Sequence, residues 1–258
     1  MNLVMIISKH RPQTQKPESE SAFGFFLAGL IDSDGHFSKI PQLVICFHEK
    51  EMHIPYYLKK KIGYGIVSKI KNKRATKFVI AHRLGLEKVC ALVRNKLRHQ
   101  DKIAQYNTRL LSIPNFESTE NNPLPIRENA WFSGFFSGDG CFQIQIVKRE
   151  SRKNAEVRVL AKIDQKTQDL LLQIKNEFGG SLGFRASQNT FYYSCTSYDS
   201  ITKCIKYFDR FHLMGVKQTQ YVIWRKVFLK IQDKNYKFTK PHLKWVGSVK
   251  KRMQSLGQ

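Results

Sequence analysis

The chain has 258 residues and a formal net charge of +24, from 44 Lys and Arg against 20 Asp and Glu. A basic surplus of this size predicts a polyanionic partner, because it attracts phosphate backbones. Hydrophobic residues make up 41% of the sequence, which excludes global disorder and allows a sizeable core. No apolar run reaches the 18 residues of a membrane span, so a membrane partner is not expected. The five cysteines form no CxxC pair and are expected to be free thiols.

The first half of the chain predicts a helix, two strands, a helix, two strands and two closing helices. Residues 1–20 are predicted to form a flexible arm before them. Apolar periodicity places the elements near 21–33, 35–40, 42–48, 50–63, 63–71, 76–83, 84–98 and 101–112. Residues 112–127 are rich in Pro, Asn, Ser and Glu, which indicates a linker.

The second half repeats this order of elements. They are expected near 127–138, 141–150, 156–165, 166–180, 181–186, 190–197, 198–210 and 216–232, and a helix near 242–256 has no counterpart. Internal duplication is the economical explanation. The predicted division is an arm (1–20), a first repeat (21–111), a linker (112–127), a second repeat (128–232) and a basic C-terminal extension with a helix (233–258).

The first helix of each repeat ends in an Asp-Gly pair. Residues 27–35 read LAGLIDSDG and residues 132–140 read FSGFFSGDG, so Asp34 and Asp139 occupy equivalent positions. A carboxylate at a helix C-terminus faces the negative end of the helix dipole. If the two helices pack side by side, the two carboxylates also repel each other. Divalent cations relieve both costs, and carboxylate, carbonyl and water oxygens suit Mg²⁺.

Small residues predict how these two helices meet. Gly24 and Ala28 share one helix face, as do Ala130 and Gly134, and such spacing allows two helices to approach closely. Glycine inside a helix costs about 1 kcal/mol relative to alanine, so Gly29 and Gly134 need a packing reason. The glycines after the two acids, Gly35 and Gly140, are expected to supply left-handed caps.

Two acids, bound magnesium and a basic surface indicate phosphodiester hydrolysis. The register of the repeat places Lys102 opposite Lys217, and Glu49 opposite Gln165. The lysines are candidates to stabilise charge in the transition state. Glu49 and Gln165 are candidates to position the attacking water.

These motifs resemble the LAGLIDADG homing endonucleases, in their single-chain, two-motif (monomeric) form. LAGLIDSDG differs from the family name only at Ser33, and the resemblance covers roughly residues 21–232. It implies an α+β fold of two pseudo-symmetric αββαββα repeats, joined through the packed motif helices, whose antiparallel strands form a DNA-binding β saddle. It also implies two or three Mg²⁺ ions between the repeats, which Mn²⁺ can replace. Their ligands would be Asp34, Asp139 and the carbonyls of Ser33 and Gly138.

The resemblance implies a second-shell role for Lys102 and Lys217 and a water-ordering role for Glu49 and Gln165. One departure is that Ser137 stands at the position that Asp32 occupies in the first motif. The position is mainly structural in the family, so the change does not imply inactivation. Glu49 opposite Gln165 makes the half-sites chemically unequal, and the two DNA strands are expected to be cut at different rates.

The alternating strands predict which side chains face a DNA major groove, which two-stranded ribbons can enter. Leu43, Ile45 and Phe47 should share a buried face, as should the odd-numbered residues from Val157 to Ile163. The opposite face carries candidate DNA contacts, which are Gln42, Cys46, His48, Arg158, Lys162 and Asp164. Further candidates are expected to point to bases, namely Ser38, Gln143 and Gln145, or to reach bases or phosphates, namely Lys69, Lys71, Lys77 and Arg185. Because the repeats differ at these positions, the target should be asymmetric.

The leading hypothesis is therefore a site-specific homing endonuclease that makes a staggered double-strand break in a long DNA target. The alternative is a group I intron RNA maturase on the same scaffold, because a charge of +24 suits RNA equally well. A DNA-binding regulator with an inactive site is a third class, which has no need for both acids. Abundant Lys, Ile, Phe and Asn have AT-rich codons and suggest an organellar genome, in a mitochondrion or chloroplast. No protein partner is expected.

Overall fold

The computed structural model describes residues 6–10, 14–148, 155–233 and 236–257. They fall into two compact units. The first unit consists of Gln15–Asp139 with Phe211–Gly215, and the second of Met1–Thr14, Gly140–Arg210 and Val216–Gln258. The second motif helix therefore groups with the first repeat, whereas the predicted division by repeats assigned it to the second. Among the described residues, no helix is long and apolar enough to cross a membrane.

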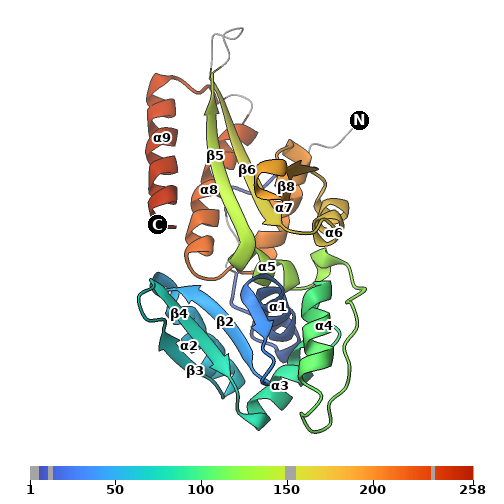
Figure 1. The fold of residues 1–258 in the computed structure, drawn as a ribbon. Coiled ribbons are helices and arrows are strands. Elements are labelled where there is room, and N and C mark those ends of the chain that lie inside the picture. Colours follow the sequence, from blue (N-terminus) through green and yellow to red (C-terminus); the bar gives the residue numbers. More distant parts are fainter. Residues whose placement is uncertain (1–5, 11–13, 149–154, 234–235, 258) are drawn as a thin grey trace. The chain divides into compact units, whose positions relative to one another are not determined.

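The first unit holds a four-stranded antiparallel sheet with the strand order β1-β2-β4-β3 (Figure 1). Its strands are β1 (Gly35–Phe37), β2 (Leu43–His48), β3 (Ile66–Lys69) and β4 (Ala75–Ile80). Its helices are α1 (Glu20–Asp34), α2 (His53–Ile62), α3 (Arg83–Val93), α4 (Gln100–Arg109) and α5 (Trp131–Asp139). The predicted buried face of β2 is confirmed, because Leu43, Ile45 and Phe47 are buried while Cys46 is exposed.

The second unit holds a sheet of the same topology, with the order β5-β6-β8-β7. Its strands are β5 (Gly140–Val147), β6 (Glu156–Gln165), β7 (Ser181–Arg185) and β8 (Thr190–Cys195). Its helices are α6 (Asp169–Phe178), α7 (Tyr198–Arg210), α8 (Val216–Gln232) and α9 (Lys240–Ser255). The described residues thus contain nine α-helices and two matching antiparallel sheets, and the predicted α+β class is confirmed.

Helices α1 and α5 pack against each other through two glycines. A Cβ added at Gly29 would overlap the carbonyl oxygen of Trp131, and one at Gly134 would overlap the carbonyl oxygen of Phe26. Each glycine thus lies against the backbone of the opposite helix, which is the packing reason that the sequence required. Phe26 and Trp131 are fully buried at this crossing.

Two sequence expectations about glycines were wrong. Gly24 does not serve the α1–α5 crossing, because its nearest neighbour is the carbonyl oxygen of Leu92 in α3. Gly35 is not a left-handed cap, since its φ of −89° and ψ of 164° are extended. An added Cβ there would lie 2.6 Å from Cα of Ile31, so the requirement for glycine is steric. Gly140 does not have a positive φ either and begins β5 directly.

The segment predicted as a linker is held down by side chains along its length. Asn107 pairs with both backbone groups of Thr119, accepting from its N–H at 2.8 Å and donating to its carbonyl at 2.9 Å. Asn95 donates its backbone N–H to the Thr119 hydroxyl at 2.7 Å. Arg98 donates to the side chain of Asn122 at 2.9 Å. These bonds fix residues without regular secondary structure onto the α3–α4 region.

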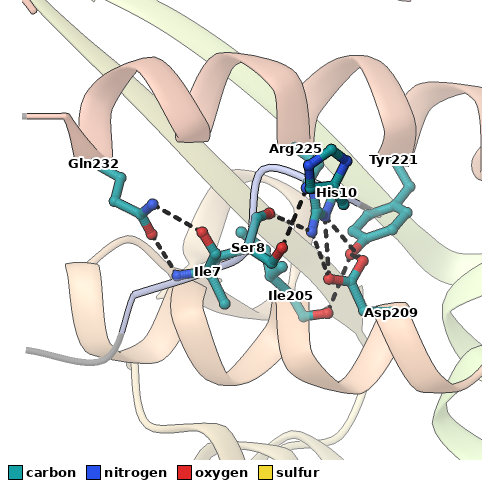
Figure 2. Close-up of polar contacts among 8 residues, drawn as sticks. All are labelled: Ile7, Ser8, His10, Ile205, Asp209, Tyr221, Arg225 and Gln232. Atoms are coloured by element: carbon teal, nitrogen blue, oxygen red, sulfur yellow. Dashed lines mark hydrogen bonds and ion pairs between the residues drawn. The ribbon is translucent and has the colours of Figure 1, made fainter. Parts of the chain in front are cut away.

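The described part of the predicted N-terminal arm docks on α7 and α8 (Figure 2). The side-chain amide of Gln232 binds both backbone groups of Ile7, at 2.6 and 2.9 Å, and the side chain of Ile7 is 4% exposed. Arg225 donates to the carbonyl of Ser8 at 3.0 Å and forms a buried ion pair with Asp209 at 2.8 Å. Tyr221 also donates to Asp209 at 2.6 Å, so the carboxylate is fully engaged.

Candidate active site

The two motif acids lie at adjacent helix ends within the first unit. Asp34 ends α1 and Asp139 ends α5. A Cβ added at Gly138 would lie 2.6 Å from Oδ2 of Asp34, so the Asp34 carboxylate rests against the residue that precedes Asp139. Asp34 is exposed and Asp139 is partly exposed, so solvent reaches both residues. The predicted convergence of the two acids is present in the geometry.

Lys102 stands beside this pair. Its Nζ donates to the carbonyl oxygen of Gly35 at 2.6 Å. Burial lowers the pKa of Lys102, while nearby carboxylates, including Asp32, Asp139 and Asp34, oppose that shift. The ammonium therefore lies within electrostatic reach of both motif acids.

Helix α4 binds β1 along one face. In addition to Lys102, Gln105 accepts from the backbone N–H of Phe37 at 3.1 Å, and Arg109 donates to the carbonyl of Phe37. Residues 102, 105 and 109 share a helix face because they are three and four apart. The lysine is thus part of a row of contacts that holds the strand immediately after Asp34.

Lys217 makes the matching contact in the second unit. Its Nζ donates to the carbonyl oxygen of Gly140, the residue that follows Asp139. In both repeats a helical lysine binds the carbonyl immediately after the motif acid. The register count that paired Lys102 with Lys217 is therefore matched by equivalent contacts.

Asp32 and Ser137 occupy matching structural positions. Oδ2 of Asp32 accepts from the backbone N–H of Arg98 and from Nε1 of Trp131, both at 2.8 Å. Burial raises the pKa of Asp32 to about 7, and these two hydrogen bonds oppose the shift. The hydroxyl of Ser137 accepts from the backbone N–H of Met214 at 3.2 Å and donates to the carbonyl of Ser133 at 2.7 Å. Each side chain thus anchors the loop that precedes α4 or α8.

The other predicted catalytic positions lie at strand ends. Glu49 follows β2, is 44% exposed and faces Arg74 at 3.9 Å. Gln165 ends β6, opposite Phe191 of β8. Ser33, predicted to offer its carbonyl, uses its hydroxyl to donate to the carbonyl of Leu30 at 3.0 Å.

The donor set fits a hard divalent cation. Two carboxylates converge, and Gly138 leaves the space that the Asp34 side chain occupies. No cluster of three His, Cys, Asp or Glu suited to a metal occurs in the part of the chain that the structure describes. A structural zinc site requires such a cluster. Mg²⁺ instead binds through one or two carboxylates and retains several waters.

The outer face of the first sheet gathers part of the predicted DNA contacts. Cys46 pairs in register with Lys77, which also pairs with Ser68, so these three side chains form one row. His48 lies on the same face. Lys69 does not join them, because its register partner is the buried Thr76 and its side chain leaves from the opposite face. The remaining candidates lie in turns beside the strands, and they are Ser38, Gln42 and Lys71.

The outer face of the second sheet gathers a larger set. Register pairs join Gln145 to Arg158, Cys141 to Lys162 and Asp164 to Tyr192, with Gln143 on the same face. Some of these charges are already paired within the protein. Arg158 binds Glu156 at 2.8 Å, and Arg185 lies 3.4 Å from Asp164.

Sequence reasoning missed two residues beside these sites. Tyr192 packs across Gly183, where an added Cβ would overlap its ring, and the Arg185 guanidinium lies 5.4 Å from the ring centroid. The period-two pattern of β8 would have placed Tyr192 on the outer face. His36 follows Gly35 in β1, and burial together with Lys102 and Arg109 lowers its pKa. Its position two residues after Asp34 was the available signal.

Comparisons with known proteins agree with this arrangement. The sequence profile of the LAGLIDADG endonucleases matches residues 132–228. An uncharacterized cox1 intron-2 37.2 kDa protein of Schizosaccharomyces pombe is 44% identical over 239 residues, covering 89% of this chain and 72% of that protein. A probable intron-encoded endonuclease 4 of Neurospora crassa is 23% identical, covering 84% of this chain and 42% of the relative. An intron-encoded RNA maturase bI4 of Saccharomyces cerevisiae is 26% identical, covering 72% and 29%.

Solved structures share the fold. The LAGLIDADG meganuclease I-AabMI bound to uncleaved DNA has a TM-score of 0.68 at 19% identity and covers 88% of this chain and 98% of that chain. The I-SmaMI LAGLIDADG homing endonuclease bound to cleaved DNA has a TM-score of 0.64 at 20% identity, covering 88% and 95%. Paired motif helices, matching sheets and the family match define the class. The chain belongs to the LAGLIDADG endonuclease family.

Proposed function

We propose that the chain is a single-chain, two-motif homing endonuclease. It makes a staggered double-strand break in a long asymmetric DNA target by Mg²⁺-dependent phosphodiester hydrolysis. The observation that carries the proposal is the convergence of Asp34 and Asp139 at the ends of two crossed helices, with Lys102 in electrostatic reach. The retained acids argue against a regulator that only binds DNA.

The residues divide the work in the following way. Asp34 and Asp139, with the carbonyls of Ser33 and Gly138, would hold the divalent ions, two or three in number. Such ions supply a lower pKa for an attacking water and stabilise the leaving oxygen. Lys102 and Lys217 stabilise negative charge that develops on the phosphate. Glu49 and Gln165 orient the attacking water.

The outer faces of the two sheets supply recognition. Their polar side chains read base edges in the major groove, and the lysines and arginines bind phosphates. The two faces carry different residues, so the two halves of the target differ in sequence. The protein acts as a monomer, and its coding sequence lies in an intron of an organellar genome, as the names of its relatives suggest.

Incubating the protein and Mg²⁺ with DNA that spans the uninterrupted insertion site tests the proposal. The wild type should cut both strands, while Asp34→Asn and Asp139→Asn should lose at least about 100-fold in rate and still bind the DNA. Asp199→Asn is the matched control, because Asp199 is an exposed acid paired with Lys203 at 2.7 Å. No cleavage by the wild type, or full cleavage by Asp34→Asn, would contradict the proposal.

The RNA maturase hypothesis makes a different forecast. Maturation rests on RNA binding, so help with intron splicing should survive loss of both motif acids. If the Asp34→Asn/Asp139→Asn variant assists splicing and the wild type does not cleave DNA, the maturase hypothesis replaces the nuclease hypothesis.

A further inference from the structure

Helix α9 presents a basic face that no part of the active site uses. Val246 and Met253 are buried on one side of the helix. Lys240, Lys244 and Lys251 lie on the opposite side, are exposed and fall within about 40° of each other at 100° per residue. Arg252 is also exposed, and residues 240–257 contain no Asp or Glu.

This clustering is costly for the helix itself. Lys240 and Lys244 are four apart, a spacing at which like charges destabilise a helix. Lys240 also occupies the first turn, where the dipole disfavours a cation. Other helices pair such charges, as Arg83 does with Glu87 at 3.2 Å. Within the described residues, no acid lies in ion-pair distance of the α9 cations. A negatively charged partner from outside the chain would offset the cost.

The place of α9 in the second unit indicates which partner can reach it. The helix packs beside β5 (Figure 1), which is the edge strand of its sheet. Nε2 of Gln220 donates to the carbonyl of Met253 at 3.1 Å, so the C-terminal end of α9 is fixed to α8 near Lys217. The ammonium of Lys226, also in α8, lies 6.0 Å from the ring centroid of Trp245 in the first half of α9.

The dimensions of a duplex place a phosphate backbone along this edge. A major groove is about 12 Å wide and admits two strands, which are about 4.8 Å apart. If the β5–β6 pair enters the groove, the sugar-phosphate strands that border the groove lie just beyond the pair. One of these sugar-phosphate strands then runs past the edge of β5 that has no strand partner, which is the edge that α9 flanks. Lysine side chains extend several ångströms from α9 toward it.

We propose that the exposed cations of α9, Lys240, Lys244, Lys251 and Arg252, bind the DNA phosphate strand that borders the major groove read by β5 and β6. The inference rests on the proposed function and adds to it a contact that carries no base information. The first unit has no equivalent helix, so the protein should hold the two halves of its target unequally.

Salt dependence of DNA binding tests the proposal. The Lys244→Gln/Lys251→Gln variant should lower the slope of log K against log salt by about 1 to 2, since each phosphate contact contributes about 0.9. Glutamine is a good helix former, so α9 should remain folded. The ranking of base-substituted targets and the cleavage rate at saturating protein should not change. The matched control is Lys59→Gln/Lys60→Gln, which removes two exposed helical charges from α2 and should leave the slope within about 0.3 of the wild type.

Neutralising individual phosphates of the DNA gives a second readout. Neutral methylphosphonate linkages in the strand that borders the groove of the second half-site should lower the wild-type slope and leave that of the α9 variant unchanged. An unaltered slope in the α9 variant, or an equal drop in the α2 control, overturns the inference about α9 and leaves the proposed nuclease function intact. A loss of affinity for structured RNA alone would also overturn it, because the partner would then be RNA. If the wild type binds no DNA, the proposed function itself fails.

Discussion

The two repeats share a lysine contact beside the motif acid and differ in the strand that follows it. In each, a helical lysine binds the carbonyl of the glycine after the motif acid, Lys102 to Gly35 and Lys217 to Gly140. In the first repeat the strand that follows has three residues, and in the second it has eight. What is shared lies beside the acids, and what differs lies where DNA would be read.

The edge of each sheet is stabilised in its own way. In the first repeat, Gln105 and Arg109 of α4 bind the backbone of Phe37 and hold β1 directly. In the second, Gln220 stands at the position equivalent to Gln105 but bonds Met253 of α9. The same kind of side chain thus fixes a strand in one repeat and an added helix in the other. The lysine–carbonyl contact beside the motif acid is therefore the same in both repeats, whereas the glutamine contact at the sheet edge differs.

The largest effect is expected where the two repeats meet in one helix crossing. Gly29→Ala and Gly134→Ala each drive a methyl group into a backbone carbonyl of the opposite helix, which side-chain motion cannot relieve. Each should lower the free energy of unfolding by about 3 kcal/mol or more, by overpacking. Chemical denaturation measures the change.

Gly247 in α9 provides the control for these substitutions. It is also a helical glycine, but a Cβ added there meets no heavy atom within 4 Å. Gly247→Ala should therefore stabilise the protein by about 0.5 to 1 kcal/mol. Equal effects at Gly29 and Gly247 would show that helix propensity, not the crossing, governs these positions.

The second effect concerns the shared lysines. Lys102→Met should reduce the rate of cleavage by about 10- to 100-fold, which corresponds to a rise of about 1.4 to 2.7 kcal/mol in the activation free energy. The substitution removes the cation near both acids and leaves the Gly35 carbonyl without its lysine donor. Lys102→Arg should recover part of the rate. Single-turnover cleavage with each strand labelled separately measures the effect.

Lys217→Met gives the matching test in the second repeat. If each repeat serves one strand, the two methionine variants should slow different strands. Equal slowing of both strands by both variants would mean that the lysines act on one common step.

Patterns in the sequence predicted the parts of this site that depend on local periodicity. Alternation along β2 and β6 identified the outer faces, and the two Asp-Gly endings marked the acids that end α1 and α5. The lysines were found by counting along the repeat, although the carbonyls they bind were not foreseen. Sequence patterns failed at positions where a tertiary contact decides which residue type is required. Gly35 is required by a clash with Ile31, not by its φ, and Gly24 faces α3 instead of α5.

The same limit applies to the outer faces. Charge patterns cannot tell which cations are neutralised within the fold, and Arg158 is already bound by Glu156. The sequence of an edge strand also does not show which face each side chain takes, because that depends on how the strand pairs with its neighbour. Lys69 pairs with buried Thr76 and therefore leaves the face that holds Lys77.

A third prediction uses the one titratable difference between the two motifs, residues 27–35 and 132–140. The pKa of Asp32 is raised by burial to about 7 in the folded state, above its ordinary value of 3.8. The folded state therefore retains a proton that the unfolded state has lost, and the free energy of unfolding should fall as pH rises from about 4 to about 7. The slope should be on the order of 1 kcal/mol per pH unit, and it should vanish above pH 7.

Asp32→Asn isolates this contribution. Its amide oxygen can accept from Arg98 and Trp131 but does not titrate, so the difference in stability between variant and wild type should grow across the same pH window. Ser137→Ala, at the equivalent position, should lower the free energy of unfolding by an amount that does not change with pH, because a hydroxyl does not titrate in this range. A constant difference for Asp32→Asn would mean that Asp32 is ionised throughout.

The smallest effects separate the two edges. Gln105→Ala leaves the half-buried N–H of Phe37 without its acceptor and should cost about 1 kcal/mol in stability, with slower cleavage because β1 follows Asp34 directly. Gln220→Ala removes only the tie to the end of α9 and should cost about 0.5 kcal/mol, with faster amide exchange near Met253. Its effect on function should appear in the salt dependence of DNA binding and not in the cleavage rate. If both variants instead slowed cleavage equally, the two glutamines would serve the same purpose, and the division between a shared catalytic contact and a divergent recognition edge would be wrong.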